Sequence, residues 1–114
     1  MISADQIRQF ALSLPEAEEK PHFERTSFRV RNKIFATLSA DETEAVLKLT
    51  VEEQTALVAA EPETFFLVGW NSQGWMGVRL GQVDAEEMRQ LLLSAWRNVA
   101  PKRVVKQFES QASS

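Results

Sequence analysis

The sequence predicts one α+β domain in which helices pack on one face of an antiparallel sheet. The 114-residue chain has 44% hydrophobic and 25% charged residues, which is typical of a single folded domain. Segments with apolar residues at helical spacing flank segments in which apolar and polar residues alternate. These segments follow one another in the order αβββαββα, without a repeat or a linker. We expect the domain to span residues 1–109 and residues 110–114 to form a flexible tail.

The first predicted element is a helix that begins after Ser3 and ends before Pro15. Ser3 and Gln6 fit a capping box, in which each side chain bonds the other residue's backbone N–H. Pro15 cannot continue a helix. The acidic and polar segment 16–20 is expected to be a surface connection. The apolar residues at helical spacing are Ile7, Phe10, Ala11 and Leu14.

Three strands are predicted next, at residues 26–30, 34–38 and 45–49. The first two are joined by the polar segment 31–33, in which Asn32 tolerates the positive φ that a tight turn needs. They are therefore expected to form a hairpin, with Phe28 and Val30 on one face and Arg29 on the other.

A second helix is expected to open at the capping box of Thr50 and Glu53 and to end near Pro62. Strands at residues 65–68 and 75–80 follow, with Trp75 and Arg79 sharing one face of the second. The last helix begins after Asp84 and ends before Pro101, and a short basic segment follows it. Its wide apolar stripe is the strongest periodic signal in the chain and consists of Met88, Leu91, Leu92, Ala95, Trp96 and Val99.

Several classes of function are excluded or disfavoured by composition. The chain has no cysteine and one histidine, His22, so thiolate chemistry and multi-histidine metal sites are excluded. Its four glycines form neither a phosphate-binding loop nor a dinucleotide fingerprint. His22 has no nucleophile motif beside it, and a structural or surface histidine is the simpler interpretation. We expect a cytoplasmic protein that is not an enzyme, has no cofactor or metal, and does not bind membranes.

The net charge of −3 hides an uneven distribution of charge along the chain. Segment 20–33 carries five basic residues against one acidic residue, and segment 97–106 carries four basic residues and no acidic one. Segment 41–63 carries seven acidic residues against one basic residue. The chain is therefore dipolar in sequence, although its overall charge opposes strong DNA binding.

The basic hairpin is a candidate nucleic-acid site. Arg29, Arg31 and Lys33 follow at every second position, so a regular ribbon would place three cations on one face, unless the turn shifts the alternation by one residue. The guanidinium fork donates two hydrogen bonds to phosphate oxygens, and a projecting ribbon can follow a nucleic-acid groove. The alternative is that these charges merely serve solubility and protect a sheet edge.

The segment from residue 69 to residue 75 is the second candidate. Trp70 and Trp75 bracket a polar loop with a glycine at each side. Exposed tryptophans can stack on bases or anchor a protein partner. The alternative is that Trp75 covers the sheet and Trp70 packs under the loop.

Nearly the whole chain, residues 3–106, resembles the MmcQ/YjbR family. That family is similar in fold to CyaY, the bacterial frataxin, and is described as binding DNA through a double wing. The resemblance implies that residues 29–33 form one wing and that the region from Trp70 to Arg79 belongs to the other. Relatives commonly carry His-Trp where this chain has Gly74-Trp75, so no role of that histidine is transferred; the first helix also lacks the acidic ridge that iron binding needs. The resemblance rests on segments 20–23, 26–38, 46–50, 73–80 and 92–101.

The leading hypothesis is a DNA-binding module without enzymatic activity that binds weakly and in a salt-dependent way. The alternative is a protein-interaction domain that uses the dipolar surface and the loop between Trp70 and Trp75. A third interpretation is a small-molecule pocket beside Trp75 and His22. The residues expected to contact nucleic acid are Arg25, Arg29, Arg31, Lys33, Trp70, Trp75, Arg79, Lys102, Arg103 and Lys106.

Overall fold

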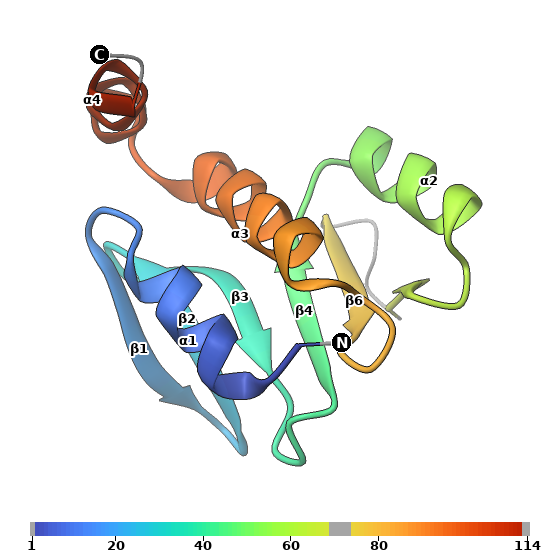
Figure 1. Ribbon diagram of the computed structural model, residues 1–114. Helices are drawn as coiled ribbons and strands as arrows, with labels where there is room; N and C mark the ends of the chain where they lie inside the picture. The colour runs from blue at the N-terminus through green and yellow to red at the C-terminus, as the bar shows by residue number, and fades with distance from the viewer. Residues whose placement is uncertain (1, 69–73, 113–114) are drawn as a thin grey trace.

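The computed structural model describes residues 2–68 and 74–112 as a six-stranded antiparallel sheet with four helices packed against it (Figure 1). The strand order is β1-β2-β3-β4-β6-β5. The predicted α+β class is confirmed. The helices are α1 (Ala4–Leu12), α2 (Val51–Ala60), α3 (Ala85–Val99) and α4 (Lys102–Ala112), and the strands are β1 (Ala17–His22), β2 (Arg25–Val30), β3 (Lys33–Leu38), β4 (Glu44–Lys48), β5 (Phe65–Leu67) and β6 (Trp75–Arg79).

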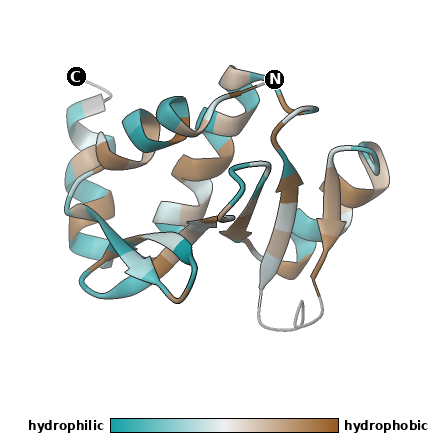
Figure 2. Cartoon of the chain, turned by 90° about the horizontal axis from the view of Figure 1, so that it is seen from below, coloured by the Kyte–Doolittle hydropathy of each residue, from teal (hydrophilic) through white to brown (hydrophobic). Residues whose placement is uncertain are grey.

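The core lies between one face of the sheet and the two helices α1 and α3. Helix α3 crosses β3 and β4, and α1 packs against α3 and β1 (Figure 1). Ribbons in Figure 2 alternate between hydrophobic and hydrophilic along most elements, as expected when each element buries one side. The predicted capping boxes are present at α1 and α2, where Ser3 and Thr50 accept from Gln6 and Glu53. No helix within residues 2–68 and 74–112 is long and apolar enough to cross a membrane.

The segment 16–20 was expected to be a surface connection, and this expectation is wrong. Residues Ala17–His22 form the edge strand β1, which pairs with β2 from Ala17 opposite Val30 to His22 opposite Arg25. Most of its side chains are exposed, so the strand lacks the alternation that identifies a half-buried strand. Pro21 and the charged side chains are typical of an edge strand, where they oppose pairing with another chain.

The sequence also predicted only a short basic segment after Pro101, whereas the structure has an 11-residue helix, α4. Val104 of α4 is buried, and the Phe108 ring lies edge-on to Trp96 with 5.2 Å between centroids. Because charged residues are frequent in this segment, its few apolar residues did not predict a helix from the sequence. The first residues of the predicted tail are helical as far as Ala112.

Trp96 is the largest of the fully buried side chains among the described residues. Its side chain is fully buried, and its indole Nε1–H donates a 3.0 Å hydrogen bond to the backbone oxygen of Pro15. That bond joins α3 to the connection between α1 and β1. The apolar stripe predicted for α3 is therefore the side that faces the core.

Candidate nucleic-acid interface

The face of the sheet opposite α1 and α3, which we call the open face, carries most of the functional candidates. Successive side chains of a strand point to opposite faces, so the burial of Phe28 and Val30 places Arg29 on the open face. The same alternation and the strand register assign five cations and two carboxylates to this face. They are Lys20, Arg25, Arg29, Lys48, Arg79, Glu18 and Glu44.

Two arginines of β2 are held in place by neighbouring side chains. Arg25 donates from Nε to the hydroxyl of Thr37 at 3.2 Å, and Arg29 donates from Nε to the hydroxyl of Ser27 at 2.9 Å. Nη2 of Arg29 also lies 3.4 Å from Nδ1 of His22. Neither arginine forms an ion pair with any residue that the structure describes. Their charges are therefore oriented and remain available to an anion.

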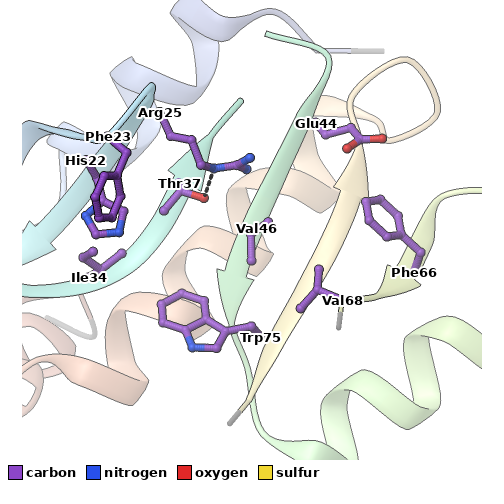
Figure 3. Close-up of a pocket in the computed structure, with 10 residues that line it drawn as sticks. All are labelled: His22, Phe23, Arg25, Ile34, Thr37, Glu44, Val46, Phe66, Val68 and Trp75. Carbon is purple, nitrogen blue, oxygen red and sulfur yellow. Dashed lines mark hydrogen bonds between the residues drawn. The ribbon is translucent and has the colours of Figure 1, made fainter. Parts of the chain in front are cut away.

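A cavity of about 540 Å³ opens on this face (Figure 3). Val46 and Thr37 lie in its middle, and Trp75 lies at one end. Most of the lining is apolar, which suits a planar organic group better than an ion. The small-molecule pocket considered beside Trp75 and His22 corresponds in position to this cavity. Its lining residues are His22, Phe23, Arg25, Ile34, Thr37, Glu44, Val46, Phe66, Val68 and Trp75.

Phe23 lies at the turn between β1 and β2 and is 94% exposed. Its φ is 58°, in the left-handed region, which an aromatic residue rarely adopts and which costs about 1 kcal/mol. Its ring lies edge-on to His22, with 4.9 Å between centroids. Strained backbone conformations of this kind cluster at functional sites.

On the other side of the cavity, Phe66 lies flat across Gly77. A Cβ at position 77 would overlap the Phe66 ring, so the close approach requires glycine. The guanidinium carbon of Arg79 lies 4.5 Å from the centre of the same ring, and its Nη1 donates to the backbone oxygen of Glu63 at 3.3 Å. The Phe66 ring and the Arg79 charge are thus fixed together on the open face.

The remaining basic residues predicted as contacts form a separate group at the β2–β3 turn and the start of α4. Arg31 and Asn32 both have positive φ, 49° and 71°, as the predicted tight turn requires. This turn ends the alternation, and Lys33 pairs with Val30 on the core side of the sheet. Arg29, Arg31 and Lys33 therefore do not form one continuous row of cations. Lys33 instead lines a second cavity, of about 470 Å³, together with Arg31 and Lys102.

Arg31 is already engaged in this second group. It donates to Glu16 from Nε at 2.8 Å and from Nη2 at 3.3 Å. This hydrogen bonding lowers the pKa of Glu16, with a smaller contribution from the charge of Arg103. Lys106 is exposed one turn further along α4. Arg31 is therefore less available to an external anion than Arg25 and Arg29 are.

The open face thus joins Arg25, Arg29, Trp75 and Arg79 from the predicted contacts. Trp70 lies outside the described residues, and of the predicted loop the structure describes Gly74 and Trp75. Four further residues of this region were not predicted from the sequence: Phe23, Glu44, Lys48 and Phe66. Strand alternation places three of them on this face, but only the pairing of β4, β6 and β5 shows that they are neighbours of Trp75.

Lys48 approaches Trp75 on this face, with 5.1 Å between Nζ and the ring centroid. Within the described ranges, no group of three or more histidine, aspartate or glutamate side chains could hold a metal ion. The arrangement therefore combines fixed cations, aromatic rings and an apolar cavity.

Comparison with known proteins agrees with this fold. The chain is similar to the crystal structure of Deinococcus radiodurans protein DR2400, a DUF419 protein, with a TM-score of 0.79 and 27% identity over 90% of this chain and 81% of that one. A Pseudomonas syringae protein, at 16% identity, shares the fold with a TM-score of 0.61 over 82% of this chain and 96% of that one. No curated protein sequence matches the chain. The YjbR family model matches residues 12–98, which is most of the chain, and the protein therefore belongs to the YjbR family.

Proposed function

We propose that this protein binds single-stranded nucleic acid across the open face of its sheet. The observation that carries the proposal is the presence of Arg25, Arg29 and Arg79 on the same face as the Phe66 and Trp75 rings. Guanidinium groups bind phosphate oxygens, and aromatic rings on a sheet surface stack on unpaired bases. Both kinds of contact are needed to hold a flexible strand.

The local charge of the open face supports this proposal despite the overall charge of −3. Five cations and two carboxylates lie on the strands of this face, and of the seven acidic residues in segment 41–63 only Glu44 is among them. A strand that follows the open face would therefore meet a positive potential, because nearby charges dominate over distant ones in salt solution.

A single strand fits this face better than a duplex does. The major groove of a duplex accepts a projecting helix or ribbon, and the tip of the β2–β3 hairpin is the ribbon that the sequence suggested. Arg31 at that tip is bound to Glu16. The apolar cavity, by contrast, is useful only to bases that are not already stacked and paired.

The proposal is tested by fluorescence anisotropy with a labelled twelve-nucleotide thymidine strand and a duplex of the same length. We expect submillimolar binding of the strand and weaker binding of the duplex. If three phosphates are contacted, the affinity should fall about 20-fold between 50 and 200 mM salt, because each contact contributes about 0.7 to the logarithmic slope. Absence of binding at 50 mM salt, or binding that does not change with salt, would overturn the proposal.

A further inference from the structure

We propose that the cavity on the open face binds one guanine base of the strand, with Arg25 and Glu44 as the groups that select it. This inference rests on the proposed function and adds a base preference to it. The cavity of about 540 Å³ lies in the size range of small-molecule sites, so a nucleotide fits within it. Its Trp75 and Phe23 rings offer aromatic surface for stacking.

Arg25 and Glu44 are the arginine and the glutamate of the lining, and they lie at the same end of the cavity (Figure 3). The strand register explains this placement, because Thr26 pairs with Leu38 and Leu38 pairs with Ala45. Arg25 directly precedes Thr26 in β2, and Glu44 directly precedes Ala45 in β4. Both therefore lie just beyond the same side of this row of paired residues. A donor fork and a carboxylate therefore lie at the same end of the cavity, where they can border two neighbouring edges of one planar group.

Both side chains keep the hydrogen-bonding capacity that the inference needs. The bond from Nε of Arg25 to Thr37 fixes the direction of the guanidinium group. Its two terminal nitrogens, and the Glu44 carboxylate, have no hydrogen-bond partner among residues 2–68 and 74–112. A ligand that satisfies both groups must offer acceptors to Arg25 and donors to Glu44.

Guanine satisfies both groups better than the other bases. Its O6 and N7 are adjacent acceptors that match a guanidinium fork. Its N1–H and N2–H₂ are adjacent donors that match a carboxylate. Adenine and cytosine offer one amino group to a carboxylate, and thymine offers a single N–H. Guanine is therefore the base that can form paired hydrogen bonds with both side chains at once.

The test compares eleven-nucleotide strands of thymidine that carry thymidine, guanosine or inosine at the central position. We expect the guanosine strand to bind the protein about 10-fold more tightly than the all-thymidine strand, since a good bidentate pair discriminates by roughly that factor or more. Inosine lacks the N2 amino group and should recover only part of this preference. A single guanosine cannot form a guanine quadruplex, so the strands differ only in the central base.

Two matched variants test whether the guanosine preference arises in the cavity. Glu44→Gln should reduce the guanosine preference, measured as the ratio of the affinities for the guanosine and all-thymidine strands, to less than about 3-fold. Glu18→Gln removes the same charge from the same face at a position that does not line the cavity, and it should keep the preference. Glu44 is exposed at the first position of β4, and thermal melting confirms that the variant is folded.

Guanosine and uridine monophosphate are titrated in parallel, so that a free nucleotide and a strand can be told apart. Guanosine preference in the strand that Glu44→Gln abolishes supports the inference. Equal binding of all strands overturns it and leaves the proposed function intact. Binding of guanosine monophosphate alone, with the same dependence on Glu44, supports the base site and overturns the proposed function. Absence of binding by strands and nucleotides overturns both.

Discussion

Replacing Arg25 and Arg29 together by glutamine should weaken the binding of the twelve-nucleotide thymidine strand, which has no guanine for Arg25 to bind, about 30-fold at 50 mM salt. Each substitution removes one charge-assisted contact to phosphate, and such contacts contribute about 1 kcal/mol or more each. The logarithmic salt slope should also fall by about 1.4, because two phosphate contacts are lost. Anisotropy titrations at two salt concentrations measure both quantities.

Two control variants show whether the effect belongs to the open face. Arg89→Gln makes the same kind of charge change on the exposed side of α3, where Arg89 pairs with Glu86 at 2.6 Å, and should leave binding within about twofold. Arg31→Gln combined with Lys33→Gln removes the hairpin-tip cations and should cost less than 5-fold. A hairpin-tip variant that binds more weakly than the variant lacking Arg25 and Arg29 would place the site at the tip instead.

Replacing Trp96 by alanine should lower the free energy of unfolding by about 4 kcal/mol. The side chain is fully buried between α3 and the sheet, and it touches Phe108 of α4. Its removal leaves a large cavity, and it also deprives the Pro15 oxygen of its indole donor. Trp96→Phe fills part of that cavity and should cost about half as much. Urea denaturation followed by far-ultraviolet circular dichroism measures the change without relying on tryptophan fluorescence.

The matched control for this prediction is Val51→Ala at the first position of α2. Val51 is 57% exposed, so its truncation should change the free energy of unfolding by less than about 0.5 kcal/mol. A loss below 1 kcal/mol in Trp96→Ala would mean that α3 is not anchored to the sheet as described.

Local sequence signals predicted the parts of the fold in which one face is buried. The six apolar positions of α3 repeat at helical spacing because that helix has a single core-facing stripe, and Asn32 marks the hairpin because its φ is positive. Strand β1 escaped detection because an edge strand exposed on most positions has no apolar alternation. Helix α4 was not predicted because only a few of its residues, Val104 and Phe108 among them, contact the core.

Only part of the candidate site could be predicted from the sequence, for a similar reason. Alternation along β6 correctly placed Trp75 and Arg79 on one face. The neighbours of these residues come from β4 and β5, and such pairing depends on register over long separations in sequence. The sequence left open whether the turn shifts the alternation; with Arg31 and Asn32 at positive φ, Lys33 pairs with Val30 on the core side of the sheet.

The most direct test of the central claim is a nitrogen-15 NMR titration of the full chain with the twelve-nucleotide thymidine strand. If the open face binds the strand, amide shifts should concentrate in β2, β4 and β6, and the Trp75 indole signal should move. The Trp96 indole, which is buried and bonded to Pro15, should stay in place. Shifts confined to Arg31, Lys33 and the start of α4, with an unchanged Trp75 indole, would contradict the account.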